Sequence, residues 1–533
     1  MKRFLVQGST PRRSFQSRMR ISTPAEAGQR AQEIAATTRT KQQHLVAPSS
    51  SSSVNDAMST LLSHAGVLDN SYHPNNLPLS PSLEFATTYT RPADGNYNSK
   101  SSSNNNHNDD DDLLGHDNNS NNNNKSYVYT RQCNPTRLRL ETTVAQLELF
   151  GGNNNSNNNA LDNDNTDYSA LITCAFSSGM MAASSLIMAH KMPLTVLLPQ
   201  DLYHGVSTVL VDVFHERWGV TVQHVDMTNV DTLKDSLLKA VTTSSSNKHC
   251  NQEKNPGSIM VWMESPSNPK CHVLDIARIC EMVNNDVRSS LRREDTNGPS
   301  ITTVVDSTLA PPPVVQQPLT LGVDVVVHSG TKYMGGHSDV LLGLTTASPW
   351  TQQGRSLIPL IRQVQQCMGG VASPMDSWLT LRGLRTLHVR VERQCSTAMI
   401  IAEHLSSLSS QSSSSSLVTA VHYPGLKNHP QHAIAKRQMG GDGLLYGGVL
   451  SLELNSEHTA MAFCGALQTI YRATSLGGTE TLIEHRASIE PPSRVTSPAG
   501  LLRLSVGLED VNDLIRDIDQ ALEIAKQVEQ ELT

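Results

Sequence analysis

Short apolar runs rich in β-branched residues recur within residues 134–345. Runs of this kind between helical stretches predict strands that are buried on both faces of a mostly parallel sheet. Four runs fit the pattern: PLTVLLP at 193–199, SIMVWME at 258–264, ITTVVD at 301–306 and VDVVV at 323–327. This part of the chain therefore has the pattern of an α/β fold.

Helical patterns separate the predicted strands. In residues 138–150, apolar positions recur at the spacing of one helix face. The stretch 177–190 opens with Ser-Ser-Gly and continues in good helix formers, which predicts a helix N-terminus near Ser178.

The C-terminal part, residues 370–533, is interpreted as a second, smaller α/β domain. Helical spacing over 381–405, a strand-like run over 446–454 and an amphipathic pattern over 510–532 predict its elements. The last pattern indicates a helix that packs on a core, because an apolar stripe of this period usually faces one.

Polar low-complexity tracts interrupt these patterns. Such runs bury too little apolar surface to offset the entropy of ordering them, so we interpret them as surface insertions at the ends of elements. The tracts lie at 101–125, 153–165, 242–257 and 406–416. The predicted segments are a disordered or targeting segment 1–60, an N-terminal arm with an Asn/Asp-rich insertion 61–133, a large domain 134–369 and a small domain 370–533.

The first fifty residues are basic, rich in hydroxyl side chains and poor in acids. Organellar transit segments share this composition, and so do ordinary disordered tails. The sequence therefore leaves two locations open, the cytoplasm or an organelle such as a mitochondrion or plastid.

Overall composition excludes several classes of protein. The 533-residue chain has a net charge of −7, which gives no basic footprint for nucleic acid. No apolar segment approaches the length of a membrane span. The eight cysteines show neither paired spacing nor the density of a secreted scaffold, which indicates reduced thiols inside a cell.

Polar residues that could take part in catalysis or ligand binding stand at the ends of the predicted strands. Glu264 closes one strand, Asp306 closes another, and the stretch HSGTK at 328–332 follows a third. In open parallel sheets, ligands collect at the carboxyl ends of the strands. We therefore expect these side chains to line one site.

Lys332 is the most unusual of these residues. An amine at the mouth of an apolar sheet is partly desolvated, which favours its neutral form and makes it a nucleophile toward an aldehyde. The hydroxyls of Ser329 and Thr331 and the backbone N–H groups of 178–180 at a helix start would suit a phosphate.

Two further residues complete a recognisable set. Asp306 could hold a ring nitrogen protonated, and Tyr203 in DLYHG offers an aromatic face. An amine for an aldehyde, a phosphate cradle and a carboxylate for a ring nitrogen are what pyridoxal 5′-phosphate (PLP) requires.

Each of these features alone has an ordinary structural explanation, and only the combination carries weight. A lone lysine is usually a solvated charge, and Ser-Ser-Gly is usually only a cap. A metal site at His328, His337 and Asp339 is disfavoured, because the spacing matches no familiar ligand pair. GTKY also lacks the P-loop pattern.

A series of motifs runs in order from about residue 79 to the C-terminus. The motifs are LSPSLEFATTYTRP, YTRQCNPTRLRLE, SSGMMAA, DLYHG, MESPSNP, VVDSTLAPP, HSGTKYMGGHSDVLLG, SPMDSWLTLRGLRTL, SLGGTETLIEH and LLRLSVGLEDVNDLI. Through them the sequence resembles the PLP-dependent enzymes of Cys/Met metabolism, the trans-sulfuration family of cystathionine γ-synthase, cystathionine lyases and methionine γ-lyase.

The resemblance implies PLP as cofactor and the PLP-dependent transferase fold type I, with a large domain around a mostly parallel sheet and a small C-terminal α/β domain. It implies a carbon–sulfur lyase or γ-replacement transferase of the cystathionine γ-synthase or γ-lyase type, acting on sulfur amino acids or activated homoserine by β/γ-elimination or γ-replacement. Cystathionine β-lyase, methionine γ-lyase and a non-catalytic PLP-fold scaffold subunit stay open as alternatives.

The resemblance also implies roles for individual residues on the cofactor side. Lys332 would bind the cofactor aldehyde and then shuttle protons, Asp306 would pair with the ring nitrogen and Tyr203 would stack on the ring, which makes these three the catalytic residues. The implied phosphate ligands are Gly179, Met180, Ser329 and Thr331, joined by Tyr129 and Arg131 from a neighbouring subunit. The active site would then be shared in a homodimer or homotetramer.

On the substrate side, Arg503 matches the arginine that grips the α-carboxylate, assisted by Ser475. Asn268 would lie near the ring oxygen and the substrate, with Glu264 behind it. Two positions depart from the family pattern: many γ-acting members carry Glu where Thr474 stands, and several lyases carry Arg where Thr208 stands. These departures leave synthase and lyase unresolved.

Overall fold

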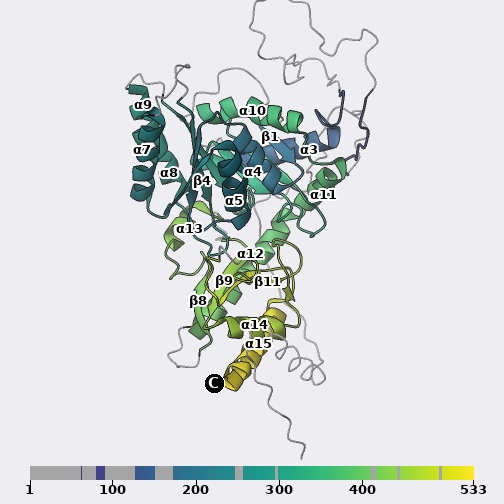
Figure 1. The fold of residues 1–533 in the computed structure, drawn as a ribbon. Helices are drawn as coiled ribbons and strands as arrows, with labels where there is room; N and C mark the ends of the chain where they lie inside the picture. Colours follow the sequence, from purple (N-terminus) through teal and green to yellow (C-terminus); the bar gives the residue numbers. More distant parts are fainter. Residues whose placement is uncertain are drawn as a thin grey trace, which may run out of the picture.

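A computed structural model describes residues 62, 80–89, 127–150, 172–246, 256–293, 298–409, 416–440, 445–490 and 495–532. Within these ranges the chain builds two sheets with helices packed on them (Figure 1). The first sheet belongs to the central part of the chain, and the second lies toward the C-terminus.

The first sheet confirms the predicted mostly parallel arrangement. In the described part of the chain its order is β1-β7-β6-β5-β4-β2-β3, and β7 is the strand that runs against its neighbours. The strands are β1 Thr173–Phe176, β2 Leu194–Pro199, β3 Thr221–Val225, β4 Ser258–Glu264, β5 Ser300–Asp306, β6 Val325–Ser329 and β7 Gly343–Ala347. β6 starts later than the predicted run and continues through Ser329, which still pairs with Gly343.

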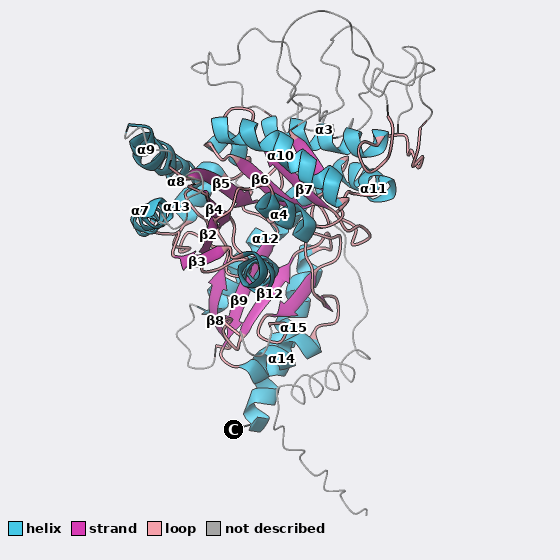
Figure 2. Ribbon diagram, turned by 45° about the horizontal axis from the view of Figure 1, so that its top comes forward, coloured by secondary structure: helices cyan, strands magenta, loops and turns pink. Residues whose placement is uncertain are grey.

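Helices cover both faces of the first sheet. Met260 and Trp262 of β4 pack in a cluster with α4, whereas Ile259 and Val261 face α7 and α8, as the period of two in a strand requires. Figure 2 shows α7 and α8 separated from α4 and α10 by the strands. The α-helices are α3 Pro135–Leu149, α4 Gly179–Met188, α5 His204–Val209, α6 Glu216–Trp218, α7 Val230–Ser246, α8 Ile276–Met282, α9 Ser289–Arg293 and α10 Gln352–Met368. The π-helical segments η5 Leu210–His215 and η6 Val283–Arg288 and the 3-10 helix η7 Pro318–Leu321 follow or separate them.

The second sheet has the order β10-β11-β12-β9-β8 in the part that the structure describes. Its strands are β8 Val418–His422, β9 Val449–Leu454, β10 Tyr471–Arg472, β11 Leu482–His485 and β12 Leu501–Ser505, accompanied by helices α12 Leu387–Ser409, α13 His432–Gln438, α14 Glu457–Ala466 and α15 Val511–Leu532. The predicted strand at 446–454 and terminal helix at 510–532 are confirmed as β9 and α15.

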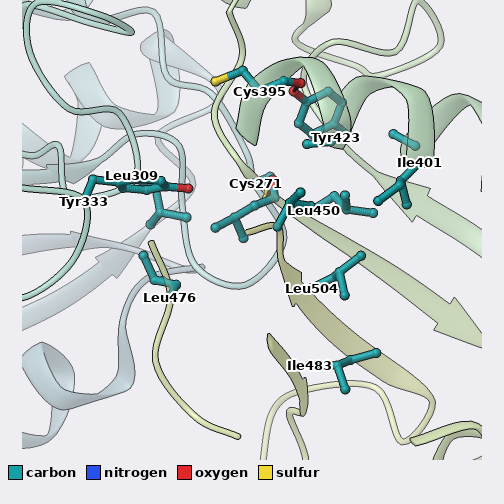
Figure 3. Packing of buried hydrophobic residues seen from close by; sticks show 14 of the residues in the cluster. Cys271, Leu309, Tyr333, Cys395, Ile401, Tyr423, Leu450, Leu476, Ile483 and Leu504 are labelled. Carbon is teal, nitrogen blue, oxygen red and sulfur yellow. Dashed lines mark hydrogen bonds between the residues drawn. The ribbon is translucent and has the colours of Figure 1, made fainter. Parts of the chain in front are cut away.

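One hydrophobic cluster joins the two parts of the molecule. Tyr333, which follows Lys332, is buried with Leu309 and Cys271 from loops of the first sheet and with Leu450 and Leu504 from the second (Figure 3). The Tyr333 hydroxyl accepts a hydrogen bond from the Gly448 backbone at 3.2 Å. The lysine loop is therefore fixed by the C-terminal core.

The helical character predicted over 381–405 is confirmed, but the chain divides it between two helices, α11 Pro374–Leu384 and α12. The carbonyl of Gly383 is taken by the Thr386 N–H and by Arg390 Nη2, which interrupts the helical ladder. α11 packs beside α3, and Trp378 Nε1 on it donates to the Pro81 carbonyl at 2.9 Å.

Two helices extend into tracts that were predicted as loops. α7 continues to Ser246 and α12 to Ser409. In α7 the hydroxyls of Thr242 and Thr243 bond to carbonyls four residues earlier, so the polar side chains are satisfied by the helix itself. Beyond these helices, the structure describes only residues 256 and 257 of the first tract and Ser416 of the second. The tracts at 101–125 and 153–165 and segment 1–60 lie outside the described residues. None of the described helices combines the length and apolarity that crossing a membrane requires.

Candidate active site

The carboxyl ends of β4, β5 and β6 bring the predicted strand-end residues together. Glu264 stands directly beside Asp306 in the register of β4 and β5, and Asp306 stands beside Val327 of β6. The Asp306 carboxylate accepts the Thr308 N–H at 3.0 Å, and the Thr308 hydroxyl accepts the Ser329 N–H at 2.8 Å. Asp306 and the lysine loop are thus linked through one residue.

The Lys332 side chain projects toward the second sheet. Its Nζ donates to the Ser475 hydroxyl at 2.8 Å, while its backbone N–H bonds to the Ser329 carbonyl at 3.1 Å. The turn is tight at Gly336, where φ is +72° and a Cβ would lie 2.0 Å from Arg390 Nη1. Burial and the nearby Arg503 charge lower the pKa of Lys332 to about 8, so a neutral, nucleophilic amine is accessible near physiological pH.

Because its pKa is lowered, Lys332 of the cofactor-free protein should react with acylating reagents at a lower pH than an ordinary lysine. Acylation of Lys332 by trace acetic anhydride, followed by peptide mass spectrometry, should rise with pH and reach its midpoint near 8, because only the neutral amine reacts. In denaturant the same lysine should shift to the usual midpoint of about 10.4. A midpoint above about 10 in the folded protein would contradict the desolvated site.

Arg503 of β12 lies at the centre of the substrate side. Its guanidinium donates to the Asn268 side chain at 3.1 Å, to the Ser475 carbonyl at 2.7 Å and to Glu484 at 2.8 Å. The Nε atom is buried and has no partner among the described residues. Ser475 holds φ at +89°, a strained value for a residue with a side chain, and it contacts both Lys332 and Arg503.

Glu264 closes the ring of contacts around Lys332. One of its oxygens accepts the Asn268 N–H at 2.8 Å, and the other accepts the Tyr203 N–H at 2.9 Å. We call the connected set Tyr203, Glu264, Asn268, Asp306, Ser329, Lys332, Ser475 and Arg503 the site ring. The structure therefore brings the sequence-predicted residues from both sheets to one place.

The site ring contains two carboxylates, Glu264 and Asp306, whose ionised forms a nearby positive charge would stabilise. Burial raises the pKa of Asp306, and burial together with the neighbouring Asp306 charge raises the pKa of Glu264. A protonated pyridine nitrogen would supply the compensating charge beside Asp306. This feature fits PLP.

The N-terminus of α4 provides the opposite end of the site. A Cβ on Gly179 would lie 3.1 Å from the Ser329 Cβ, so glycine permits the helix start to sit against β6. The first-turn N–H groups of a helix, here those of Gly179 and Met180, have no intrahelical partners and attract anions. The Thr331 hydroxyl exchanges hydrogen bonds with the Leu342 backbone at 3.2 and 2.9 Å. The cradle therefore fits a phosphate through backbone groups and Ser329.

Tyr129 and Arg131 stand apart from the site ring within their own chain. Tyr129 is 41% exposed, and Arg131 donates to the Gln366 carbonyl at 2.5 Å. The Arg131 guanidinium carbon lies 5.7 Å from the centroid of the Tyr129 ring. Neither side chain has a hydrogen bond to the site ring among the described residues.

Sequence reasoning missed three residues next to the site ring. Glu484 pairs with Arg503, Arg486 pairs with Glu484, and His204 lies within electrostatic range of these three charges. Burial and the Arg486 charge lower the pKa of His204. Glu484 lay within a recognised motif, but only the pairing of β11 with β12 reveals its partner.

Known proteins resemble this chain over most of its length. A family model described as Cys/Met metabolism PLP-dependent enzyme matches residues 99–523. Cystathionine beta-lyase of Lactococcus lactis subsp. cremoris (strain MG1363) is 36% identical over 406 residues, or 75% of this chain and 89% of that protein. Cystathionine gamma-lyase of Bacillus subtilis (strain 168) is 34% identical over 404 residues, or 74% and 89%.

A solved structure extends the similarity to three dimensions. Cystathionine gamma synthase from Xanthomonas oryzae pv. oryzae in complex with cystathionine matches with a TM-score of 0.66 and 27% identity, covering 90% of this chain and 100% of that chain. The range that the family model matches contains the whole site ring.

Proposed function

The chain belongs to the Cys/Met metabolism family of PLP-dependent enzymes, and we propose that it uses the site ring to cleave or form cystathionine. It is a PLP-dependent trans-sulfuration enzyme, a carbon–sulfur lyase or transferase. The observation that carries the proposal is the contact of Lys332 and Arg503 with the same residue, Ser475.

The residues that would hold the cofactor surround Lys332. The Lys332 amine would bind the aldehyde, Asp306 would hold the proton on the ring nitrogen, and Tyr203 would cover one face of the ring. Asn268 would meet a ring oxygen through its side-chain amide. The backbone of Gly179 and Met180, with the Ser329 hydroxyl, would receive the phosphate, whereas the Thr331 hydroxyl already donates to the Leu342 carbonyl.

Bound PLP supplies an electron sink that makes the Cα proton of an amino acid acidic. The charge on Asp306 sustains that property by keeping the ring nitrogen protonated. In the cofactor-free site, burial lowers the pKa of Lys332 to about 8, so its neutral amine would be suited to take the Cα proton and return it elsewhere. Ser475 holds the amine in place by accepting its hydrogen bond.

Arg503 would fix the substrate by its α-carboxylate. A guanidinium fork binds a carboxylate through two parallel hydrogen bonds, and the buried Nε of Arg503 has no partner within the described ranges. Asn268 and Ser475 hold the guanidinium from two sides. The substrate class is therefore an amino acid with a free α-carboxylate.

Direct assays separate the possible reactions. Purified protein with PLP should either cleave cystathionine or form it from cysteine and an activated homoserine ester. Analysis of the keto acid from cleavage also distinguishes γ- from β-elimination. Absence of turnover with cystathionine, homoserine esters and methionine would contradict the proposal and favour a non-catalytic scaffold.

The subunits are proposed to share their active sites in a homodimer or homotetramer. Support comes from Tyr129 and Arg131, which match the family's phosphate-binding pair yet are directed to Gln366 and the surface of their own chain. A neighbouring copy would then receive these side chains at its phosphate cradle.

Mixed subunits test this sharing. Arg131→Ala and Lys332→Ala should each be inactive or nearly so, because each removes one half of a site. Co-expressed, they should regain roughly a quarter of wild-type activity, the share of intact sites that random pairing gives in dimers. No recovery in mixed dimers verified by mass spectrometry would contradict the arrangement, and two Lys332→Ala subunits are the control.

A cytoplasmic location is proposed, with a mitochondrion or plastid as the address if segment 1–60 acts as a transit peptide. The basic, hydroxyl-rich composition of the segment supports the second address. Fusing residues 1–60 to a fluorescent protein distinguishes the two, since an ordinary tail leaves the fluorescence diffuse.

A further inference from the structure

Four charged side chains form a line that begins at Arg503 and leads away from the site ring. Glu484 of β11 lies opposite Arg503 of β12 in the strand register, and its Oε2 accepts Arg503 Nη2 at 2.8 Å. Its other oxygen accepts Arg486 Nη1. Arg486 Nη2 lies 3.6 Å from Glu490 Oε1, so positive and negative charges alternate along the line.

The line is buried along its whole length. Exposed fractions are 4% for Arg503, 4% for Glu484, 1% for Arg486 and 8% for Glu490. At this depth, charges interact strongly and each must be balanced. Glu490 is itself held by the Thr496 and Ser497 N–H groups at 2.7 and 3.1 Å, which fixes the far end.

Glu484 is the acidic partner of Arg503. A carboxylate facing a single guanidinium prefers to bind it through both oxygens. Here Arg486 occupies one oxygen, so Glu484 contacts Arg503 through the other oxygen alone. The Arg503 Nε has no partner among the described residues.

We propose that Arg486 is a positioning residue that, by dividing the Glu484 carboxylate between two guanidiniums, keeps Arg503 open for the α-carboxylate of the amino acid substrate. This inference rests on the proposed role of Arg503. Among the described residues, the Arg486 guanidinium pairs with Glu484 and Glu490, so its influence on Arg503 passes through Glu484.

Two probes isolate the α-carboxylate. L-norleucine and pentylamine differ only by that group, so the ratio of their dissociation constants, measured by calorimetry and by inhibition of turnover, reports carboxylate recognition. In Arg486→Met, norleucine should bind roughly tenfold more weakly, the worth of one charge-assisted hydrogen bond, while pentylamine stays within about twofold. Arg486→Gln, whose neutral amide would hold Glu484 more weakly than a guanidinium does, is the second variant should Met not fold, and a smaller loss in the same direction is expected.

A double variant separates positioning from simple structural support. Glu484→Gln combined with Arg486→Met removes the competing charge together with its restraint, so norleucine binding should return to within about threefold of wild type. An unchanged ratio in the single variants, or a double variant as weak as the single, would overturn the inference.

The variant Arg503→Lys tests the premise that Arg503 binds the α-carboxylate of the substrate. This variant should abolish the preference for norleucine over pentylamine, because lysine lacks the two-pronged fork. If Arg503→Lys keeps the wild-type ratio, the proposed substrate grip fails. If it loses the ratio while Arg486→Met and Arg486→Gln keep it, the positioning role alone fails.

Discussion

Replacing Lys332 with alanine should remove the yellow colour of the purified enzyme and lower turnover by at least about a thousandfold, because both the covalent anchor and the proton shuttle are lost. The fold should persist. Lys332 contributes one side-chain hydrogen bond, to Ser475, worth about 1 kcal/mol, and the neighbouring Tyr333 keeps the loop packed in the core.

Absorbance, turnover and thermal unfolding measured on the same preparation check this result. The matched control is Lys427→Ala, which removes an exposed lysine far from the site ring in sequence and should leave all three measurements unchanged. A Lys332→Ala enzyme that stays yellow and active would place the chemistry on another amine.

Replacing Asp306 with asparagine should lower turnover by roughly a thousandfold while the protein still binds PLP. Asparagine keeps the shape and can still accept the Thr308 N–H, but it cannot hold a proton on the ring nitrogen as a carboxylate does. The defect should therefore appear in kcat, with a small change in cofactor affinity.

Asp226 offers a matched control for this substitution. It also follows a strand, β3, and its carboxylate accepts the Thr228 N–H at 3.0 Å, the same local contact that Asp306 makes with Thr308. Asp226→Asn should leave turnover within about twofold, since a partly exposed cap contributes little. Equal losses in the two variants would show that the capping bond, and not the charge beside the cofactor, matters.

Much of the cofactor side could be predicted because it depends on local sequence. Asp306 and Lys332 follow apolar runs, and parallel strands deliver such residues to a common edge. The helix start at Ser178 was equally visible, and its side chain caps the Met181 N–H as expected. These features need no knowledge of distant contacts.

The substrate side depends on pairings that sequence does not display. Arg503 reaches Asn268, 235 positions away, only because the second sheet packs against the loop that follows β4. The opposition of Glu484 and Arg503 requires the register of β11 and β12. The burial of Arg486 contradicts the usual exposure of arginine and could not be anticipated.

Errors in the predicted elements have similar causes. The break between α11 and α12 arises because the Gly383 carbonyl bonds to Thr386 and Arg390, although the apolar spacing runs on without interruption. The extension of α7 depends on threonine hydroxyls that bond back to the helix. The boundary between domains at residue 370 stays a prediction.

Mapping the reduced cofactor onto the chain tests the central claim most directly. Borohydride fixes the carbon–nitrogen bond between a lysine and PLP, and digestion with mass spectrometry then identifies the labelled peptide. We predict a single phosphopyridoxyl label on Lys332. A label on a different lysine, or an unlabelled chain after incubation with excess PLP, would contradict the account.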